Sequence, residues 1–266
     1  MLKYLDTIIT EFLRDGVRVR VLHEYQNHPL ISGNKWWKLK FNLEQARNEG
    51  HDTLLTFGGA YSNHIYATAA AAKECGFKSI GIIRGEEVDN ATLKFARDQG
   101  MKLEFISREE YRRKEELKFS GIYVIPEGGT NECAIEGCAE WGRKLLSIDF
   151  DQAYIPVGTG GTLKGLMKGI DGKREVIGVP VLKNYDYDGR LLKEYHHGGY
   201  AKTTKELLGF CELMNREYNI VVEPTYTGKL FYAVFDQIDR GVIKKGTTVL
   251  VIHTGGLQVL RNTGSR

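Results

Sequence analysis

The stretch AYIPVGTGGTLKGL at residues 153–166 joins an apolar run to a glycine-rich turn and then to the start of a helical pattern. A strand, a turn and a helix in this order form the repeating unit of α/β proteins. The turn also has a chemical meaning, because backbone N–H groups at a helix N-terminus can bind a phosphate where no side chain stands in the way. A turn without any ligand would have the same sequence, so this stretch predicts the fold and leaves the ligand open.

The same unit recurs along most of the chain. Helical patterns alternate with short apolar runs, and this alternation predicts parallel sheets that are covered by helices on both faces. The predicted strands cover residues 53–57, 79–83, 102–106, 122–125, 153–157, 175–181, 218–222 and 247–252, and the predicted helices cover residues 34–48, 62–75, 90–99, 108–118, 131–146, 161–170, 188–213 and 228–239. The predicted fold class is therefore α/β.

Composition and charge exclude several other classes of protein. Hydrophobic residues make up 42% and charged residues 27% of the 266 residues, and a net charge of only +3 is unlike a nucleic-acid-binding protein. No apolar run approaches the roughly 20 residues that span a bilayer, and the acidic residues in the N-terminal segment are unlike a signal peptide. The four cysteines have no metal-binding spacing. We expect a cytoplasmic protein with reduced thiols, no metal, and neither a nucleic-acid nor a membrane partner.

Glycine follows most of the predicted strands. In open α/β sheets, ligands bind beyond the carboxyl ends of the strands, where glycine lets the backbone approach them closely. One glycine pair after a strand is equally consistent with an ordinary turn, but several together predict one cleft built from many segments. The glycines lie at residues 58–59, 85, 128–129, 158–161 (interrupted by Thr159) and 255–256.

A lysine in the segment SGNKWWKLK, residues 32–40, could act as a nucleophile. Lys35 directly follows a Gly-Asn pair at the predicted start of a helix, where the helix dipole disfavours an ammonium group. Together with burial, this position would lower the pKa of the amine and supply the neutral form that a Schiff base requires. A solvated lysine on an amphipathic helix is the ordinary alternative, and the spacing does not choose among Lys35, Lys38 and Lys40.

A second junction of strand, turn and helix lies at FGGAYSNH, residues 57–64. Ser62 would cap the helix, which is the ordinary role of a serine at this position. Asn63 and His64 could donate hydrogen bonds to a carboxylate or a phenolic oxygen there. Because Ser62 lacks the G-x-S-x-G frame, the segment does not indicate a serine hydrolase.

The glycine loop at residues 158–161 also weighs against two nucleotide-binding classes. It lacks the Lys-Ser/Thr pair of a P-loop and the G-x-G-x-x-G spacing of a nicotinamide-binding turn. A nicotinamide-dependent oxidoreductase and a non-catalytic protein that binds a phosphorylated ligand nevertheless stay as alternatives.

Six short motifs, taken in order, resemble one family of enzymes. The motifs are GNK at 33–35, GGAYSN at 58–63, PEGGTN at 126–131, GTGG at 158–161, YTGK at 226–229 and HTGG at 253–256. The series resembles the 1-aminocyclopropane-1-carboxylate (ACC) deaminase / D-cysteine desulfhydrase family, which consists of pyridoxal 5′-phosphate (PLP) enzymes with the tryptophan-synthase-β-like fold, fold type II. The resemblance extends over residues 27–257. One departure is Trp37, where members of the family usually carry an arginine.

With this resemblance, we expect two parallel-sheet domains with PLP in the cleft between them. A smaller α/β domain of residues 50–146 would be inserted into a larger cofactor-binding domain formed by residues 1–49 and 147–266. The resemblance also suggests a homodimer.

The same resemblance implies roles for residues of this chain. Lys35 would carry PLP as a Schiff base, and Asn63 would hold the phenolic oxygen of the cofactor. Ser62 would be the nucleophile or the hydroxyl group that handles a proton, and Tyr226 would lie beside the substrate. The other expected contacts are Lys38, Gly158, Thr159, Gly160, Gly161, Thr162 and Thr254 for the cofactor, and Asn63 and His64 for the substrate carboxylate.

The expected substrate is a small amino acid with a leaving group on its β-carbon, such as D-cysteine, which would be converted to a 2-oxo acid and ammonia. Thr227 and Thr254 stand where ACC deaminases typically carry glutamate and leucine, whereas desulfhydrase-like members carry small hydroxyl residues. A carboxylate near the pyridine nitrogen would make the cofactor a stronger electron sink than a threonine hydroxyl would. ACC deamination is the alternative.

Overall fold

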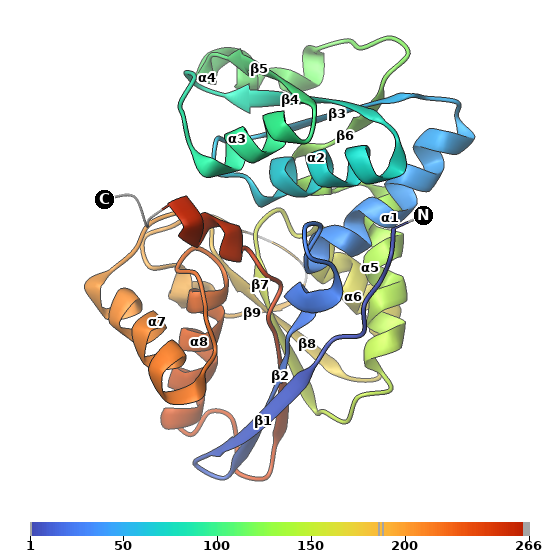
Figure 1. The fold of residues 1–266 in the computed structure, drawn as a ribbon. Helices are drawn as coiled ribbons and strands as arrows, with labels where there is room; N and C mark the ends of the chain where they lie inside the picture. The colour runs from blue at the N-terminus through green and yellow to red at the C-terminus, as the bar shows by residue number, and fades with distance from the viewer. Residues whose placement is uncertain (1, 186, 188, 263–266) are drawn as a thin grey trace.

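Two β-sheets, each covered by helices, make up the fold (Figure 1). The structure is a computed structural model that describes residues 2–185, 187 and 189–262. One sheet lies in the lower part of Figure 1 and the other in the upper part, and helix α1 (Asn34–Asn48) runs from the first to the second. The predicted α/β fold class is confirmed.

The larger sheet has six strands in the order β1-β2-β10-β7-β8-β9. Strands β1 and β2 form an antiparallel hairpin, and every other pair of neighbours in this sheet is parallel. The strands are β1 (Ile9–Arg14), β2 (Val17–Leu22), β7 (Gln152–Val157), β8 (Glu175–Pro180), β9 (Arg190–Leu191) and β10 (Thr248–Ile252).

The smaller sheet has four parallel strands in the order β5-β4-β3-β6. They are β3 (Thr53–Gly58), β4 (Lys78–Arg84), β5 (Met101–Ile106) and β6 (Tyr123–Ile125). The remaining helices are α2 (Asn63–Cys75), α3 (Ala91–Asp98), α4 (Arg108–Arg112), α5 (Glu132–Leu145), α6 (Gly161–Ile170), α7 (Lys205–Tyr218) and α8 (Thr227–Asp239), with 3-10 turns η1 (Glu24–Asn27), η2 (Lys114–Glu116), η3 (Glu127–Gly129), η4 (Lys193–His196) and η5 (Leu257–Asn262).

Helix α5 packs closely against both α1 and α6, because glycine at the contacts removes the side chains that would separate them. A Cβ on Gly169 of α6 would lie 2.0 Å from the carbonyl oxygen of Ala139, and a Cβ on Gly137 would lie 2.0 Å from that of Trp37. Such distances leave room only for glycine. Helix α5 therefore packs with helices at the larger sheet, although its residues fall within the predicted smaller domain.

Two predicted elements are wrong. The predicted helix 188–213 begins only at Lys205. The chain before it turns at Gly198 and Gly199, whose φ angles of 91° and 114° are incompatible with an α-helix. Residue 188 lies outside the described residues. The predicted strand 218–222 is the end of α7 followed by irregular chain, and Asn219 at its C-cap is left-handed, with φ of 54°.

The hairpin β1–β2 was not predicted, although its turn carries a clear signal. Asp15 and Gly16 join the two strands and both have positive φ, 46° and 80°. An Asp-Gly pair between alternating apolar residues is typical of a tight hairpin turn with this backbone.

The three tryptophans of the chain pack in the core. Trp36, Trp37 and Trp141 are all buried. The ring of Trp37 stacks on that of Trp141 with centroids 5.9 Å apart, and its Nε1 donates to the buried carboxylate of Glu24 at 2.7 Å. The side chain at position 37, where the family resemblance led us to expect an arginine, thus lies in the core.

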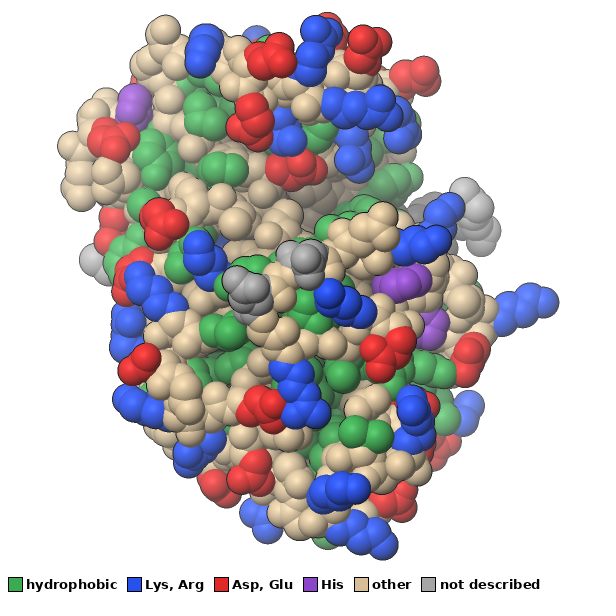
Figure 2. Space-filling model, turned by 180° about the vertical axis from the view of Figure 1, so that it is seen from behind, with side chains coloured by type: hydrophobic (Ala, Val, Ile, Leu, Met, Phe, Trp, Pro, Cys, Tyr) green, Lys and Arg blue, Asp and Glu red, His purple; other side chains and the backbone are tan. Residues whose placement is uncertain are grey.

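The surface mixes both signs of charge. Figure 2 shows lysine and arginine side chains interspersed with aspartate and glutamate over one whole face. Across the described part of the chain, none of the helices is long and apolar enough to cross a membrane.

Candidate active site

A large cleft lies at the carboxyl ends of strands from both sheets. It is lined by turns that follow β3, β4 and β7, by the N-terminal ends of α1, α2 and α8, and by the segment after β10. Of the twelve predicted site residues, all but Gly161 line this one cleft: Lys35, Lys38, Ser62, Asn63, His64, Gly158, Thr159, Gly160, Thr162, Tyr226 and Thr254. The structure therefore brings together residues that are up to 219 positions apart (Lys35 to Thr254, 254 − 35).

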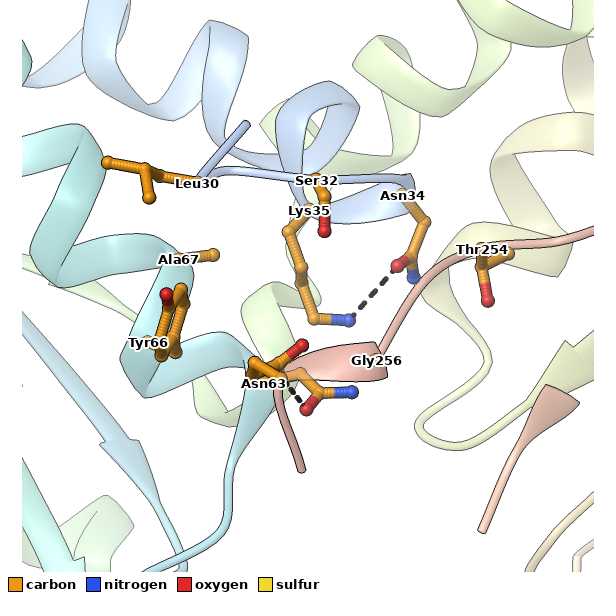
Figure 3. A pocket seen from close by; sticks show the side chains of 10 residues that line it. Leu30, Ser32, Asn34, Lys35, Asn63, Tyr66, Ala67, Thr254 and Gly256 are labelled. Atoms are coloured by element: carbon orange, nitrogen blue, oxygen red, sulfur yellow. Dashed lines mark hydrogen bonds between the residues drawn. The ribbon is translucent and has the colours of Figure 1, made fainter. Parts of the chain in front are cut away.

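Lys35 lies in the first turn of α1, and the backbone before it is tightly held. Gly33 has a positive φ of 68°, and a Cβ there would lie 1.8 Å from the carbonyl oxygen of Thr254. Asn27 accepts a hydrogen bond from Gly33 N at 2.8 Å and donates one to Gly33 O at 3.0 Å. Figure 3 shows the Lys35 side chain pointing into a pocket toward Asn63, with its Nζ donating to Asn34 Oδ1 at 3.3 Å.

The three lysines of the segment have different surroundings. Burial, and next the charge of Lys38, lowers the pKa of Lys35 to about 7, so a large share of this amine is neutral at physiological pH. Burial also lowers the pKa of Lys38 to about 8, and its Nζ donates to Gly128 O at 2.7 Å. Lys40 instead forms an ion pair with Glu140 at 2.5 Å. The environment of Lys35 is the one that a nucleophilic amine requires.

The glycine loop before α6, residues 158–161, packs closely against the turn that precedes α5, residues 128–130. A Cβ on Gly161 would lie 2.8 Å from the side chain of Thr130, and a Cβ on Gly128 would lie 2.9 Å from that of Thr159. The Thr130 and Thr159 hydroxyls form a hydrogen bond of 2.7 Å. A further hydrogen bond of 2.9 Å joins Asn34 Nδ2 to the Thr162 hydroxyl. The loop thus presents backbone at a helix N-terminus to the cleft, where a phosphate could bind.

The turn after β3 carries Ser62, Asn63 and His64 at the start of α2. Ser62 caps this helix, since its hydroxyl accepts from the backbone N–H of His64 at 3.2 Å and of Ile65 at 3.3 Å. Asn63 Oδ1 accepts a hydrogen bond from Gln258. Asn63 Nδ2 lies on the side of Gly256, where a Cβ would be 2.8 Å from it.

His64 is buried and held by Thr56, whose hydroxyl is 2.9 Å from its Nε2. Its Nδ1 is also buried and has no hydrogen-bond partner within the described part of the chain. Burial, with the charges of Lys35 and Lys38, lowers the pKa of His64 well below its usual value, so the ring is neutral at physiological pH. A neutral imidazole can still donate one hydrogen bond.

Tyr226 is positioned by a residue that the sequence did not single out. The buried carboxylate of Glu223 accepts hydrogen bonds from the backbone N–H groups of Thr225, Tyr226 and Thr227 at 2.7, 2.8 and 2.7 Å. The Tyr226 ring packs against Gly158, where a Cβ would lie 3.2 Å from its hydroxyl. An acidic residue just before a helix start was the available signal, because such residues satisfy the first N–H groups of a helix.

The two threonines that bear on substrate choice lie differently. Thr254 lines the cleft, in contact with Gly33. Thr227 is fully buried, and its hydroxyl lies 3.3 Å from the Glu223 carboxylate. Of these two residues, Thr254 is the one that faces the cleft.

Residues 10–184 match the protein family described as "Pyridoxal-phosphate dependent enzyme". The chain belongs to this family. A protein of Pyrococcus abyssi, whose name gives ACC deaminase as a provisional activity, is 31% identical over 96% of this chain and 88% of its own length. The Arabidopsis thaliana mitochondrial bifunctional D-cysteine desulfhydrase/ACC deaminase is 30% identical over 85% of this chain and 69% of its own length.

A solved structure of an ACC deaminase homologue has the same fold. It superimposes with a TM-score of 0.85 at 26% identity and covers 97% of this chain and 91% of that one. The chain is thus a PLP-dependent enzyme with the tryptophan-synthase-β-like fold, and the family resemblance of its six motifs is confirmed.

The side chains in the cleft fit PLP. An amine with a lowered pKa at Lys35, a glycine-rich loop at the N-terminus of α6 and an amide donor at Asn63 are the three features that its aldehyde, phosphate and phenolic oxygen need. They line one cleft.

Proposed function

We propose that this enzyme converts D-cysteine, or a similar small amino acid with a leaving group on its β-carbon, to a 2-oxo acid and ammonia. The observation that carries the proposal is the lowered pKa of Lys35 at the start of α1, in the cleft that also contains the glycine cradle. Relatives named as desulfhydrase and deaminase support the same class of reaction.

In this proposal, five groups of the chain hold the cofactor. Lys35 forms the covalent link, and the backbone and hydroxyls of residues 158–162 bind the phosphate, with Lys38 close by as a cation. Asn63 Nδ2 donates to the phenolic oxygen, and Thr254 lies beside the ring. When bound, PLP withdraws electrons from the α-carbon of an amino acid and so acidifies its proton.

The chain then supplies the acid and base. The Lys35 amine, whose pKa is lowered to about 7, accepts the α-proton in its neutral form. The N-terminus of α2, with Asn63 and the neutral His64, holds the substrate carboxylate. The Ser62 hydroxyl caps α2 and also exchanges a proton with the substrate. The ring of Tyr226 packs against the substrate from the side of α8.

The choice of D-cysteine over ACC rests on Thr254. Its hydroxyl makes that part of the cleft polar, which suits a thiol better than the methylenes of a cyclopropane ring. ACC deamination is the second candidate, because relatives carry this activity in their names.

A spectrum and one assay test the proposed function. The purified protein should be yellow, should bleach with borohydride, and should release pyruvate and sulfide from D-cysteine. A yellow protein that releases no 2-oxo acid from D-cysteine, from other β-substituted amino acids or from ACC would contradict it.

We also propose that the protein is a cytoplasmic homodimer with two domains. The close packing of α5 on α1 and α6 supports ending the inserted smaller domain near residue 130 and not at 146. Light scattering of the PLP-loaded protein tests the dimer, since a monomeric mass would exclude it.

A further inference from the structure

Two arginines line the cleft on the side of the smaller sheet. Arg84 is the last residue of β4, and Arg108 is the first residue of α4. A Cβ on Gly85, the residue after Arg84, would lie 3.9 Å from Arg108 Nε, so the Arg108 side chain approaches the end of β4. They are the arginines found in the lining of the cleft.

Arg84 lies next to the turn proposed to hold the substrate carboxylate. Strands β3 and β4 pair in parallel with Gly58 opposite Ile83, which places Arg84 beside Gly59. A Cβ on Gly59 would lie 3.6 Å from Arg84 Nη2. The guanidinium also stacks over the buried ring of Tyr111, 5.5 Å from the ring centroid, and this contact restricts where the charge can lie.

Neither guanidinium has a hydrogen-bonded or ion-paired acceptor among the described residues. The acidic side chains of the cleft are engaged or solvated: Glu127 pairs with Lys114 at 3.4 Å, Glu223 accepts from three backbone N–H groups, and Glu86 and Glu212 are exposed. Both arginines are exposed, so their N–H groups bond to solvent and not to an acceptor within the described part of the chain. A solvated arginine beside a substrate-binding turn can exchange water for an anionic ligand group.

We propose that Arg84, with Arg108 beside it, forms a subsite for a negatively charged substituent on the β-carbon of the substrate. The preferred substrates are then amino acids with a second anionic group, such as a sulfonate, a sulfate ester or an ionised thiol. This inference rests on the proposed function, which supplies the orientation of the substrate carboxylate at the N-terminus of α2.

The reaction balances without any oxidant or reductant. The bond from the α-carbon to hydrogen breaks, and its electrons form the double bond between the α- and β-carbons. The substituent leaves with the electron pair of its bond to the β-carbon. The α-proton passes to Lys35, and a proton then adds to the β-carbon, which becomes a methyl group. Water finally replaces nitrogen at the α-carbon, which yields pyruvate and ammonium. Arg84 would stabilise the departing anion as well as the bound one.

Binding of unreactive acids tests the subsite apart from turnover. The probe is 3-sulfopropanoate, which has a carboxylate and a sulfonate but no amine, and the reference is butanoate, which has a methyl group in place of the sulfonate. Calorimetry of the PLP-loaded protein should show at least tenfold tighter binding of the sulfonate, about 1.4 kcal/mol.

Arg84→Gln should remove this preference, and Arg84→Lys should keep part of it. Arg112→Gln is the matched control, because Arg112 is an exposed arginine of the same helix as Arg108 and does not line the cleft. Equal affinities for the two acids, or an Arg84→Gln protein that binds them like Arg112→Gln, would overturn the proposal.

Turnover provides the second comparison. Serine O-sulfate and 3-chloroalanine both have good leaving groups, but only the first is anionic at the β-substituent. Arg84→Gln should lower kcat/KM for the sulfate at least tenfold more than for 3-chloroalanine, a difference of about 1.4 kcal/mol, and equal losses for the two substrates would overturn the proposal. If a yellow protein releases a 2-oxo acid from neither compound, nor from D-cysteine or ACC, the proposed function fails, and the calorimetric comparison still decides the subsite.

Discussion

Lys35 illustrates how a single position can make a side chain reactive. The backbone before it passes so close to Thr254 that only glycine fits at position 33. The Lys35 amine is buried near Lys38, and both the burial and the charge of Lys38 disfavour the protonated form. In the sequence, the Gly-Asn pair and the predicted helix start pointed to this segment as a source of a reactive amine. The sequence did not choose among three lysines, because the burial that separates Lys35 from Lys40 depends on tertiary contacts.

We predict that Lys35→Ala loses the yellow colour and lowers turnover by a factor on the order of 10³, because the protein then lacks both the covalent link and the base. Lys40→Ala is the control, since Lys40 is ion-paired with Glu140. Lys38→Ala should also keep the colour. Mass spectrometry after borohydride reduction checks the assignment, and a pyridoxyl group on Lys38 or Lys40 would refute it.

The lowered pKa of Lys35 also predicts how attachment of PLP to the cofactor-free protein depends on pH. The amine reacts when neutral, so the rate should rise about tenfold per pH unit below 7 and level off above it. A solvated lysine, with a pKa near 10.4, would give a rate that still rises at pH 9. Stopped-flow absorbance measures the rate, and a continued rise through pH 9 would contradict the buried environment.

At the scale of single elements, the sequence predicted best where strands are buried on both faces. Apolar runs marked β3, β4, β7, β8 and β10 within one residue at either end. The hairpin β1–β2 was missed because its first strand has only half-buried and exposed positions, so no apolar run marks it. The predicted helix 188–213 failed because two left-handed glycines, Gly198 and Gly199, outweigh the helical pattern around them.

The glycine loop before α6 carries the next prediction. Gly161→Val should weaken PLP affinity at least tenfold, about 1.4 kcal/mol, because the side chain would collide with Thr130 and displace the loop. Gly209→Ala is the matched control, since no atom lies within 4 Å of a Cβ there. Fluorescence titration of the cofactor-free proteins measures the affinity. Unchanged affinity in a folded Gly161→Val protein would move the phosphate site elsewhere.

Turn η1 carries a pH-dependent contribution to stability through Glu24. Burial raises the pKa of this carboxyl from 4.5 to about 7, despite the hydrogen bonds from Trp37 and Asn27. Between pH 4.5 and 7, the folded state keeps a proton that the unfolded state has released. The free energy of unfolding therefore falls as pH rises through this window.

Glu24→Gln should remove this dependence. The stability of the variant relative to the wild type should rise by up to about 1.4 kcal/mol per pH unit between pH 4.5 and 7, and stay level above it. Urea unfolding at several pH values measures the difference. Glu109→Gln, at an exposed position, is the control. A difference that is the same at all pH values would show that Glu24 titrates like a solvated glutamate.

At the scale of the whole molecule, the cleft is the feature that the sequence predicted only in outline. Glycine at the strand ends indicated one cleft, and the structure gathers those turns at the carboxyl ends of both sheets. The close packing of α5 on α1 and α6 was not predicted, because single glycines within a helical pattern do not show which neighbour they approach. Glu223 was missed for a similar reason, since its role depends on the turn that brings three N–H groups to one carboxylate.

The last prediction concerns the substrate that the assembled cleft selects. Thiolate is a good leaving group, so D-cysteine needs only a mild electron sink, whereas opening a cyclopropane ring needs a stronger one. The cleft offers the hydroxyl of Thr254 beside Lys35, and Thr227 is buried against Glu223. We therefore expect kcat/KM to be higher for D-cysteine than for ACC, measured as 2-oxo acid release by one preparation at matched concentrations.

The Thr254→Leu variant tests whether the hydroxyl of this one residue selects the substrate. Loss of the hydroxyl should lower kcat/KM for D-cysteine about tenfold, which corresponds to one hydrogen bond of roughly 1.4 kcal/mol. Activity on ACC should not fall in parallel, because its ring methylenes have no hydrogen bond to lose. A wild-type enzyme that prefers ACC, or a Thr254→Leu variant that loses activity on both substrates equally, would show that the polar wall does not select the substrate.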